Sequence, residues 1–251
     1  MMNKYKLAEM TWPEVEEALD QGVDTVVVTF GSTEQHGLHL PLCTDYLWGE
    51  YLGERVALQL GNALLAPSLR IGCSEHHMAF PGSITLSKET FIKVVVDYCN
   101  SLSRHGFNNI VLIPTHGGNF APLAEAVEST ADNLSDTNII AYTDLMELMD
   151  VTAPIAMARG VTPEEAGAHA GEWETSMMMA LRPELVAMDK AEAGYMGDMK
   201  SAAPIVFEQG FRALTHNGVL GDPEKADPKS GEAYLDELVD LLVQYVQSHR
   251  R

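Results

Sequence analysis

The sequence carries little positive charge. Only 16 of its 251 residues are Lys or Arg, against 36 Asp or Glu, and the formal net charge is -20 at pH 7. A protein this negative repels the phosphates of nucleic acids and of anionic membranes. The composition therefore predicts a protein that binds neither a nucleic acid nor a membrane.

Cysteine, long apolar runs and phosphate-binding loops are also scarce or missing. The three cysteines show no Cys-x-x-Cys spacing, which disfavours a disulfide framework. No apolar run approaches the roughly 20 residues of a membrane span, and the first residues lack the apolar core of a signal peptide. No Walker loop and no Gly-x-Gly-x-x-Gly pattern supports nucleotide binding. These absences predict a cytoplasmic location.

The hydrophobic pattern alternates between strands and helices. Apolar runs predict strands at 24–30, 63–67, 109–114 and 138–142, and helical periodicity predicts helices at 46–60, 88–103, 121–134, 146–149, 176–181 and 232–249. Such alternation is typical of a mostly parallel sheet with helices on both faces. The stretch 191–227 is rich in Gly, Pro and Ala and is expected to be ordered loop. We therefore predict an α/β fold, a three-layer α/β/α sandwich, with 1–251 as a single domain.

Acidic residues and histidines follow the first predicted strand. The segment 31–45 contains Glu34, His36, His39 and Asp45. In α/β proteins, functional side chains gather at the carboxyl ends of parallel strands. Asp, Glu and His are the ligands that divalent first-row metals take. The segment predicts part of a metal site, and the alternative is an ordinary polar loop.

A further histidine follows the third predicted strand. His116 precedes Gly117 and Gly118, which allow a close backbone approach or a positive φ. Because the ends of neighbouring strands converge, His116 is expected to meet Glu34 and Asp45. The alternative is a tight turn with a buried histidine.

Two more segments offer groups that could hold a metal or move a proton. If the helix predicted at 176–181 already begins near Gly171, Glu172 and Glu174 lie early in it, where acidic residues also favour the helix dipole, and His169 lies just before it. Of the adjacent pair His76 and His77, at most one is expected to face a site. This inventory suits metal-assisted hydrolysis, which needs a carboxylate between two ions and a group that carries a proton to the leaving nitrogen. The bridging candidate is Asp45, and the proton-carrying candidates are His169, Glu174 and His76.

Several segments together resemble the creatininase (creatinine amidohydrolase) family. They read Gly-Ser-Thr-Glu-Gln-His-Gly-Leu-His-Leu-Pro-Leu-Cys-Thr-Asp at 31–45, Ser-Glu-His-His-Met-Ala-Phe-Pro-Gly-Ser at 74–83, His-Gly-Gly-Asn at 116–119, His-Ala-Gly-Glu-Trp-Glu-Thr-Ser at 169–176 and Asn-Gly-Val-Leu-Gly-Asp-Pro at 217–223. The resemblance implies a three-layer α/β fold and a centre of two divalent metal ions, whether zinc, manganese or iron. It also implies cleavage of a C–N amide-type bond and, as is common in the family, a hexamer or another homo-oligomer.

The resemblance also implies roles for single residues. It places two metal ions on four side chains, with Glu34 and His116 on the first ion, His36 on the second and Asp45 on both. Creatininase itself has a Tyr-Glu pair where this chain has Gly117-Gly118, and the Glu of that pair binds the second ion. We expect Glu172 to replace this ligand, and we expect His39 to have a supporting or structural role.

The leading hypothesis is therefore a binuclear metal-dependent amidohydrolase. It would cleave a C–N bond of a small cyclic amide or formamide with activated water. Creatinine is not expected as the substrate, because the residues of its pocket differ here. A peptidase or a sugar-derivative hydrolase could use the same centre. The alternative from another class is a metal- or ligand-binding protein without turnover.

Overall fold

Four parallel strands form the sheet at the centre of the molecule. The computed structural model describes residues 4–131, 134 and 136–250, without the side chains of 131, 199 and 200, and gives the strand order β2-β1-β3-β4. The strands are β1 (Thr25–Phe30), β2 (Ala63–Leu65), β3 (Asn109–Pro114) and β4 (Asn138–Ala141). The central pair, β1 and β3, is in register from Thr25↔Asn109 to Phe30↔Pro114, so both strands end at the same level. The predicted parallel sheet is confirmed.

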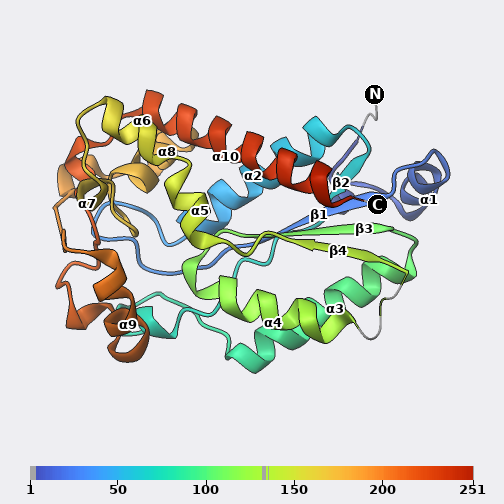
Figure 1. The fold of residues 1–251 in the computed structure, drawn as a ribbon, viewed down its shortest axis with the longest axis horizontal. Coiled ribbons are helices and arrows are strands. Elements are labelled where there is room, and N and C mark those ends of the chain that lie inside the picture. The colour runs from blue at the N-terminus through green and yellow to red at the C-terminus, as the bar shows by residue number, and fades with distance from the viewer. Residues whose placement is uncertain (1–3, 132–133, 135, 251) are drawn as a thin grey trace.

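Helices cover both faces of this sheet (Figure 1). One face carries α2 (Thr44–Leu60) and α10 (Pro228–His249), and the other carries α3 (Lys88–Arg104) and α4 (Phe120–Ala131). Helix α8 (Glu172–Leu181) packs against α10 and α2 at the left end of the first layer in Figure 1. Successive strand side chains point to opposite faces. Val27 and Val111 therefore lie in the apolar cluster under α2 and α10. Val26 and Ile110 lie in the apolar cluster on the opposite face, under α3 and α4, to which α1 (Trp12–Asp20) also contributes. This is the predicted three-layer α/β/α arrangement.

The remaining helices lie beyond the carboxyl ends of the strands, on the left of Figure 1. They are the short helices α5 (Leu145–Asp150), α6 (Ala153–Ala158) and α7 (Pro163–Ala166), together with α9 (Met199–Gln209). None of the helices in the described part of the chain is long and apolar enough to cross a membrane.

The structure differs from the sequence-based expectation in the stretch 191–227. The composition predicts loop here, yet α9 lies within this stretch. Pro204 inside the helix weakens the local signal. The helix is held by tertiary packing, because Val206 forms a buried cluster with Phe211 and Leu220. Several boundaries also shift, most of all the starts of α8, at Glu172 instead of 176, and of α10, at Pro228 instead of 232. The predicted helix end at 134 borders residues 132, 133 and 135, which are outside the described part.

Candidate metal centre

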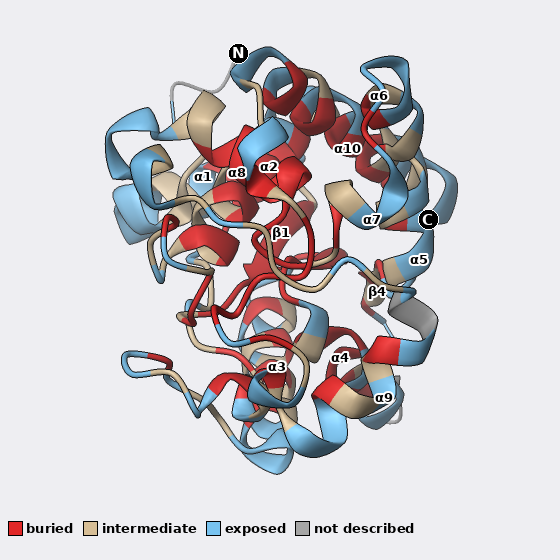
Figure 2. Cartoon of the chain, turned by 90° about the vertical axis from the view of Figure 1, so that its left-hand side faces the viewer, coloured by how far each residue is buried: buried red, intermediate tan, exposed pale blue. Residues whose placement is uncertain are grey.

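The carboxyl ends of β1 and β3 bring the predicted residues of the first two segments together. After β1 the chain folds back on itself, with the Glu34 N–H donating to the Leu42 carbonyl at 3.0 Å. Asp45 lies in the first turn of α2, and His116 comes two residues after β3. Figure 2 looks onto this end of the molecule and shows buried segments gathered around β1. Glu34, Asp45 and His116 are all at most 4% exposed, and His36 is fully buried.

The side chain of Asp45 lies between two histidines. Its Oδ1 is 2.9 Å from His36 Nε2, and its Oδ2 is 3.2 Å from His116 Nδ1. Glu34 Oε1 is 3.1 Å from the same His116 nitrogen. The carboxylate of Asp45 therefore has the position expected of a bridging group.

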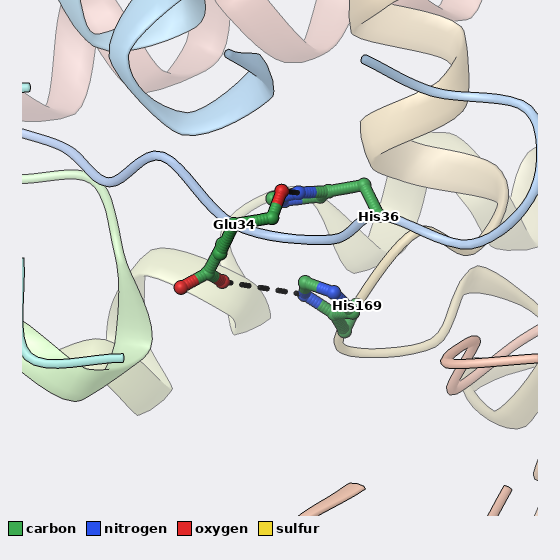
Figure 3. Close-up of side chains that lie close together, drawn as sticks. All are labelled: Glu34, His36 and His169. Atoms are coloured by element: carbon green, nitrogen blue, oxygen red, sulfur yellow. Dashed lines mark hydrogen bonds and ion pairs between the residues drawn. The ribbon is translucent and has the colours of Figure 1, made fainter. Parts of the chain in front are cut away.

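Backbone carbonyls determine which nitrogen each of these histidines turns inward. His36 Nδ1 donates to the Glu34 carbonyl at 3.2 Å (Figure 3), and His116 Nε2 donates to the Cys73 carbonyl at 3.1 Å. A carbonyl only accepts, so the nitrogen facing it keeps its proton, and the opposite nitrogen faces the carboxylates and can bind a metal ion once its own proton has left. Metal-binding histidines are commonly held in this way.

The two histidines are strongly cationic when no metal is bound. Burial lowers the pKa of His36, but the carboxylates of Asp45 and Glu174 raise it to about 10. Burial also opposes protonation of His116, yet Glu34 and Asp45 hold its pKa well above the usual range. The pKa of Asp45 is lowered despite its burial, because both imidazolium groups stabilise the carboxylate. Any divalent ion that binds here displaces protons from these rings.

The two acidic residues of α8 point to different surroundings. Glu174 is 5% exposed, and its Oε2 lies 3.8 Å from His36 Nε2 and accepts the Ala170 N–H at 2.6 Å. Burial raises the pKa of Glu174 to about 7. The charge of His36 opposes this rise, and the neighbouring carboxylate of Asp45 adds to it. Its carboxylate lies close enough to the side chains of His36 and Asp45 to share a metal ion with them.

Glu172 lies elsewhere, which differs from its expected place in the ligand set. Its Oε1 accepts from the Arg159 guanidinium at 3.0 Å and from the Ser176 hydroxyl at 2.9 Å, and its Oε2 accepts from the Tyr234 hydroxyl at 2.8 Å. Side chains two positions apart on an α-helix point in directions about 200° apart around the helix axis, so Glu172 and Glu174 cannot both face the cluster. Glu172 instead ties α8 to α10, and Glu174 is the α8 carboxylate at the cluster.

Three further histidines, His169, His77 and His76, lie around the cluster. His169 Nδ1 is 4.0 Å from Glu34 Oε1 (Figure 3), and its ring centroid is 4.2 Å from that of His36. His77 is 1% exposed, and its Nε2 is 3.0 Å from Glu34 Oε1. His76 lines the space outside, with its ring stacked on that of His116 at 5.6 Å between centroids. The sequence suggests His76 as a candidate for the site and gives no reason to choose His77. The 3-10 turn at Glu75–His77 decides which of the two rings points inward.

Burial keeps these outer histidines neutral. It lowers the pKa of His76 to about 3, with the charge of His116 adding to the effect. The pKa of His169 is also well below its usual value, first through burial and then through the charge of His36. His39 lies apart from the cluster, with its Nε2 2.9 Å from the Thr175 hydroxyl.

A cavity of about 210 Å³ opens beside the cluster. Its walls are mainly apolar, and its described lining includes no Lys or Arg. Aromatic and Met side chains from α2, α4, α5, α8, α9 and the turn after α9 form these walls, namely Trp48, Phe120, Met146, Met149, Trp173, Phe207 and Phe211. Phe207 and Met146 are also 56% and 51% exposed, so they stand at the rim. The cavity can take an apolar, uncharged group next to the cluster.

Two carboxylate oxygens in the cluster have no hydrogen-bond donor. Glu34 Oε2 and Asp45 Oδ2 are buried without a hydrogen bond, and Asp45 Oδ2 has only its ion-pair contact with His116. Buried polar atoms without a hydrogen bond are rare in folded proteins, because each one lowers the stability of the fold by about 1–3 kcal/mol. Carboxylates, and imidazoles that lose their inward proton on binding, form a donor set that divalent first-row ions prefer. The described residues therefore fit divalent metal ions.

A parallel α/β sheet with such a cluster at its strand ends fits a metal-dependent enzyme as the class of protein. The comparison with known proteins narrows this class. A family model described as creatininase, creatinine amidohydrolase, matches residues 8–246. The chain belongs to the creatininase family.

Curated relatives of the chain are hydrolases. The mycofactocin precursor peptide peptidase of Mycolicibacterium smegmatis is 31% identical over 223 residues, which is 87% of this chain and 82% of that protein. The creatinine amidohydrolase of Pseudomonas putida is 29% identical over 194 residues, which is 73% of this chain and 74% of that protein. These relatives support a metal-dependent hydrolase.

Solved structures of creatininases share the fold. A crystal structure of creatinine amidohydrolase is 25% identical, covers 100% of both chains and gives a TM-score of 0.83. Two others, each covering 98% of both chains, are described as a mutant creatininase of Zn-Zn type and as a Mn form, with 25% and 26% identity and TM-scores of 0.83 and 0.82. Zinc and manganese forms therefore exist among the structural relatives.

Proposed function

We propose that this protein is a hydrolase with two divalent metal ions that cleaves a C–N bond of a small cyclic amide or formamide. The observation that carries the proposal is the pair of buried carboxylate oxygens on Glu34 and Asp45 without a hydrogen bond from the described residues, beside the inward nitrogens of His36 and His116. The side chains of His36, Asp45 and Glu174 lie close enough together to form the ligand group of a second ion.

In this proposal Glu34, His116 and Asp45 would hold the first ion, and His36, Glu174 and Asp45 would hold the second. Zinc or manganese is supported by the forms of the solved relatives, and iron is the third candidate. When bound, such ions polarise a carbonyl and lower the pKa of water.

We assign proton transfer to His169. It is neutral, buried and 4.0 Å from Glu34, so its ring can take a proton near the reacting atoms and return it to the leaving nitrogen. His76 lines the cavity and is the second candidate. Glu174, which is also a candidate from the sequence, is better suited as a ligand because of its distance to His36.

A peptidase is the second candidate function. Relatives at 29–31% identity are named as peptide peptidases. The apolar cavity with exposed Phe207 and Met146 at its rim also suits an apolar side chain of a larger substrate.

An assay of metal-loaded protein separates these functions. Zinc- and manganese-loaded protein is incubated with cyclic amides, N-formyl amines, short peptides and sugar lactones, and the products are quantified by mass spectrometry. We expect amide or formamide hydrolysis that EDTA abolishes, metal restores and Asp45→Asn eliminates. Asp97→Asn, at an exposed position of α3, is the matched control and should retain activity.

The other results would change the assignment. Turnover of peptides alone would select the peptidase, and turnover of lactones alone would select a sugar-derivative hydrolase. Stoichiometric metal without any turnover would favour a binding protein.

The organisation of the protein is part of the proposal. We propose a single domain over 1–251 that acts in the cytoplasm on a small-molecule amide, as a homo-oligomer with a hexamer as the expected assembly. Light scattering after size exclusion gives the mass of the assembly and tests this number.

A further inference from the structure

Gln35 is a buried residue between the histidines of the cluster. It is 4% exposed, and its side-chain amide nitrogen lies 3.1 Å from His77 Nδ1, 3.1 Å from His169 Nε2 and 3.2 Å from the Gly218 carbonyl. Gln35 is neither a proposed metal ligand nor a proposed proton carrier. It contacts the rings of His77 and His169, which both face Glu34.

Two backbone groups fix the orientation of the Gln35 amide. The Gly37 N–H donates to Oε1 at 3.0 Å, and the Gly218 carbonyl accepts from Nε2. Exchanging the oxygen and the nitrogen would place donor against donor and acceptor against acceptor. The fit is also tight, because a Cβ added to Gly218 would lie 2.0 Å from Gln35 Oε1. The amide NH₂ therefore faces the two histidines.

The amide determines which nitrogen of His77 carries the proton. An NH₂ group has two hydrogens and only donates: one goes to the Gly218 carbonyl and the other to His77 Nδ1, which must accept. The proton of His77 is therefore on Nε2. This Nε2 lies 3.0 Å from Glu34 Oε1, so His77 donates a hydrogen bond to the Glu34 carboxylate. His77 thus presents an N–H to the cluster and no lone pair.

The backbone of the same residue orients His169 in the opposite sense. His169 Nε2 is 2.7 Å from the Gln35 carbonyl, which can only accept, so this nitrogen carries the proton. It makes no hydrogen bond with the Gln35 amide nitrogen 3.1 Å away, whose two hydrogens go to His77 and Gly218. The bare Nδ1 then faces the cluster, 4.0 Å from Glu34 Oε1. His169 is held by a carbonyl in the same manner as His36 and His116, and His77 is the exception.

We infer that Gln35 is a positioning residue that assigns opposite tasks to two histidines. Through its side chain it makes His77 a hydrogen-bond donor that fixes Glu34, and through its carbonyl it leaves His169 with a lone pair toward the centre. The task of His169 as a base rests on the proposed function, whereas the two proton positions do not.

Nitrogen NMR of the metal-free protein tests the proton positions directly. Protein labelled with ¹⁵N-histidine gives long-range ¹H–¹⁵N spectra that distinguish a protonated from a bare ring nitrogen, and His77→Gln and His169→Gln assign the signals. We expect both rings to carry the proton on Nε2. A wild-type His77 with its proton on Nδ1 would overturn the inference.

Two substitutions separate the side chain from the backbone of Gln35. Gln35→Glu puts an acceptor in front of His77, so its proton should appear on Nδ1, while His169 should stay unchanged. Gln35→Met removes the donor without adding an acceptor and should give His77 in both forms. The signal of His39, which contacts Thr175, serves as the internal control. An unchanged His77 in both variants would contradict the assignment.

Metal loading links the inference to the reaction. Outer partners of metal-binding residues typically change metal affinity or activity about 10–100-fold. We expect Gln35→Glu to lower kcat by about 10–100-fold, with KM changed far less, and to weaken zinc binding. Wild-type protein that binds no metal would refute the proposed function and leave the proton positions standing. If Gln35→Glu does not fold, the wild-type and Gln35→Met spectra decide.

Discussion

Replacing Glu172 should destabilise the fold and leave the metal in place. The change we consider is Glu172→Met, which keeps the length of the side chain and removes both acceptor oxygens. Glu172 is fully buried and accepts from Arg159, Ser176 and Tyr234. None of these contacts reaches the metal cluster.

The size of the effect follows from the partners left behind. A buried donor without an acceptor costs about 1–3 kcal/mol, which applies to the Tyr234 hydroxyl. Losing one partner of a buried ion pair costs about 3–5 kcal/mol. The second figure is reduced here because Arg159 is 34% exposed and also donates to Ser230. We expect a loss of about 3–5 kcal/mol in total, or roughly 10 °C in the unfolding midpoint of a chain of this length.

The assay compares this variant with Glu174→Gln. Thermal unfolding in EDTA gives the stability of each metal-free protein, and inductively coupled plasma mass spectrometry gives metal per chain after loading and gel filtration. Glu172→Met should lose stability and keep its metal. Glu174→Gln should stay within about 1 kcal/mol of the wild type, because the Gln oxygen still accepts from Ala170, and should lose metal. The opposite pattern would refute the placement of both residues.

Three further predictions concern the cluster and the cavity. Because burial is outweighed by neighbouring carboxylates, His36 and His116 are protonated at pH 7 without metal. Metal binding should therefore release about two protons and weaken as pH falls, which calorimetry in buffers of different ionisation enthalpy measures; proton-neutral binding would contradict this. A Cβ at Gly118 would lie 2.2 Å from a backbone oxygen, so Gly118→Ala should cost about 1–3 kcal/mol and weaken zinc binding, whereas Gly117→Ala, with open space around it, should match the wild type in both measurements. Phe207→Ala should raise KM for substrates with an apolar group near the scissile bond without changing the unfolding midpoint, and an equal KM for apolar and polar substrates in the wild type would contradict this.

The sheet and the first half of the cluster could be predicted because their signals are local. The β-branched run of β1 and the polar segment after it are adjacent in sequence, and the same holds for β3 and His116. Parallel strands end at one edge, so pattern alone brings Glu34, Asp45 and His116 together.

The contributions of α8 could not be read in this way. Whether Glu172 or Glu174 faces the cluster depends on the rotation of the helix about its axis, and that rotation is set by contacts with Arg159 and Tyr234, which are distant in sequence. Either residue satisfies the preference for acids in a first helical turn.

Two inner residues escape sequence reasoning for a similar cause. The direction of His77 depends on a 3-10 turn, and the importance of Gln35 depends on the close approach of Gly218, 183 residues later. Both lie inside the segments that resemble the family, which is the only available signal. Helix α9 escapes prediction because its packing partners Phe211 and Leu220 lie outside it.

Anomalous diffraction from crystals of zinc-loaded protein, measured on both sides of the zinc edge, tests the central claim most directly. The account predicts two peaks per chain, one beside Glu34 and His116 and one beside His36 and Glu174, with Asp45 between them. A single peak, no peak, or a peak beside Glu172 would contradict it.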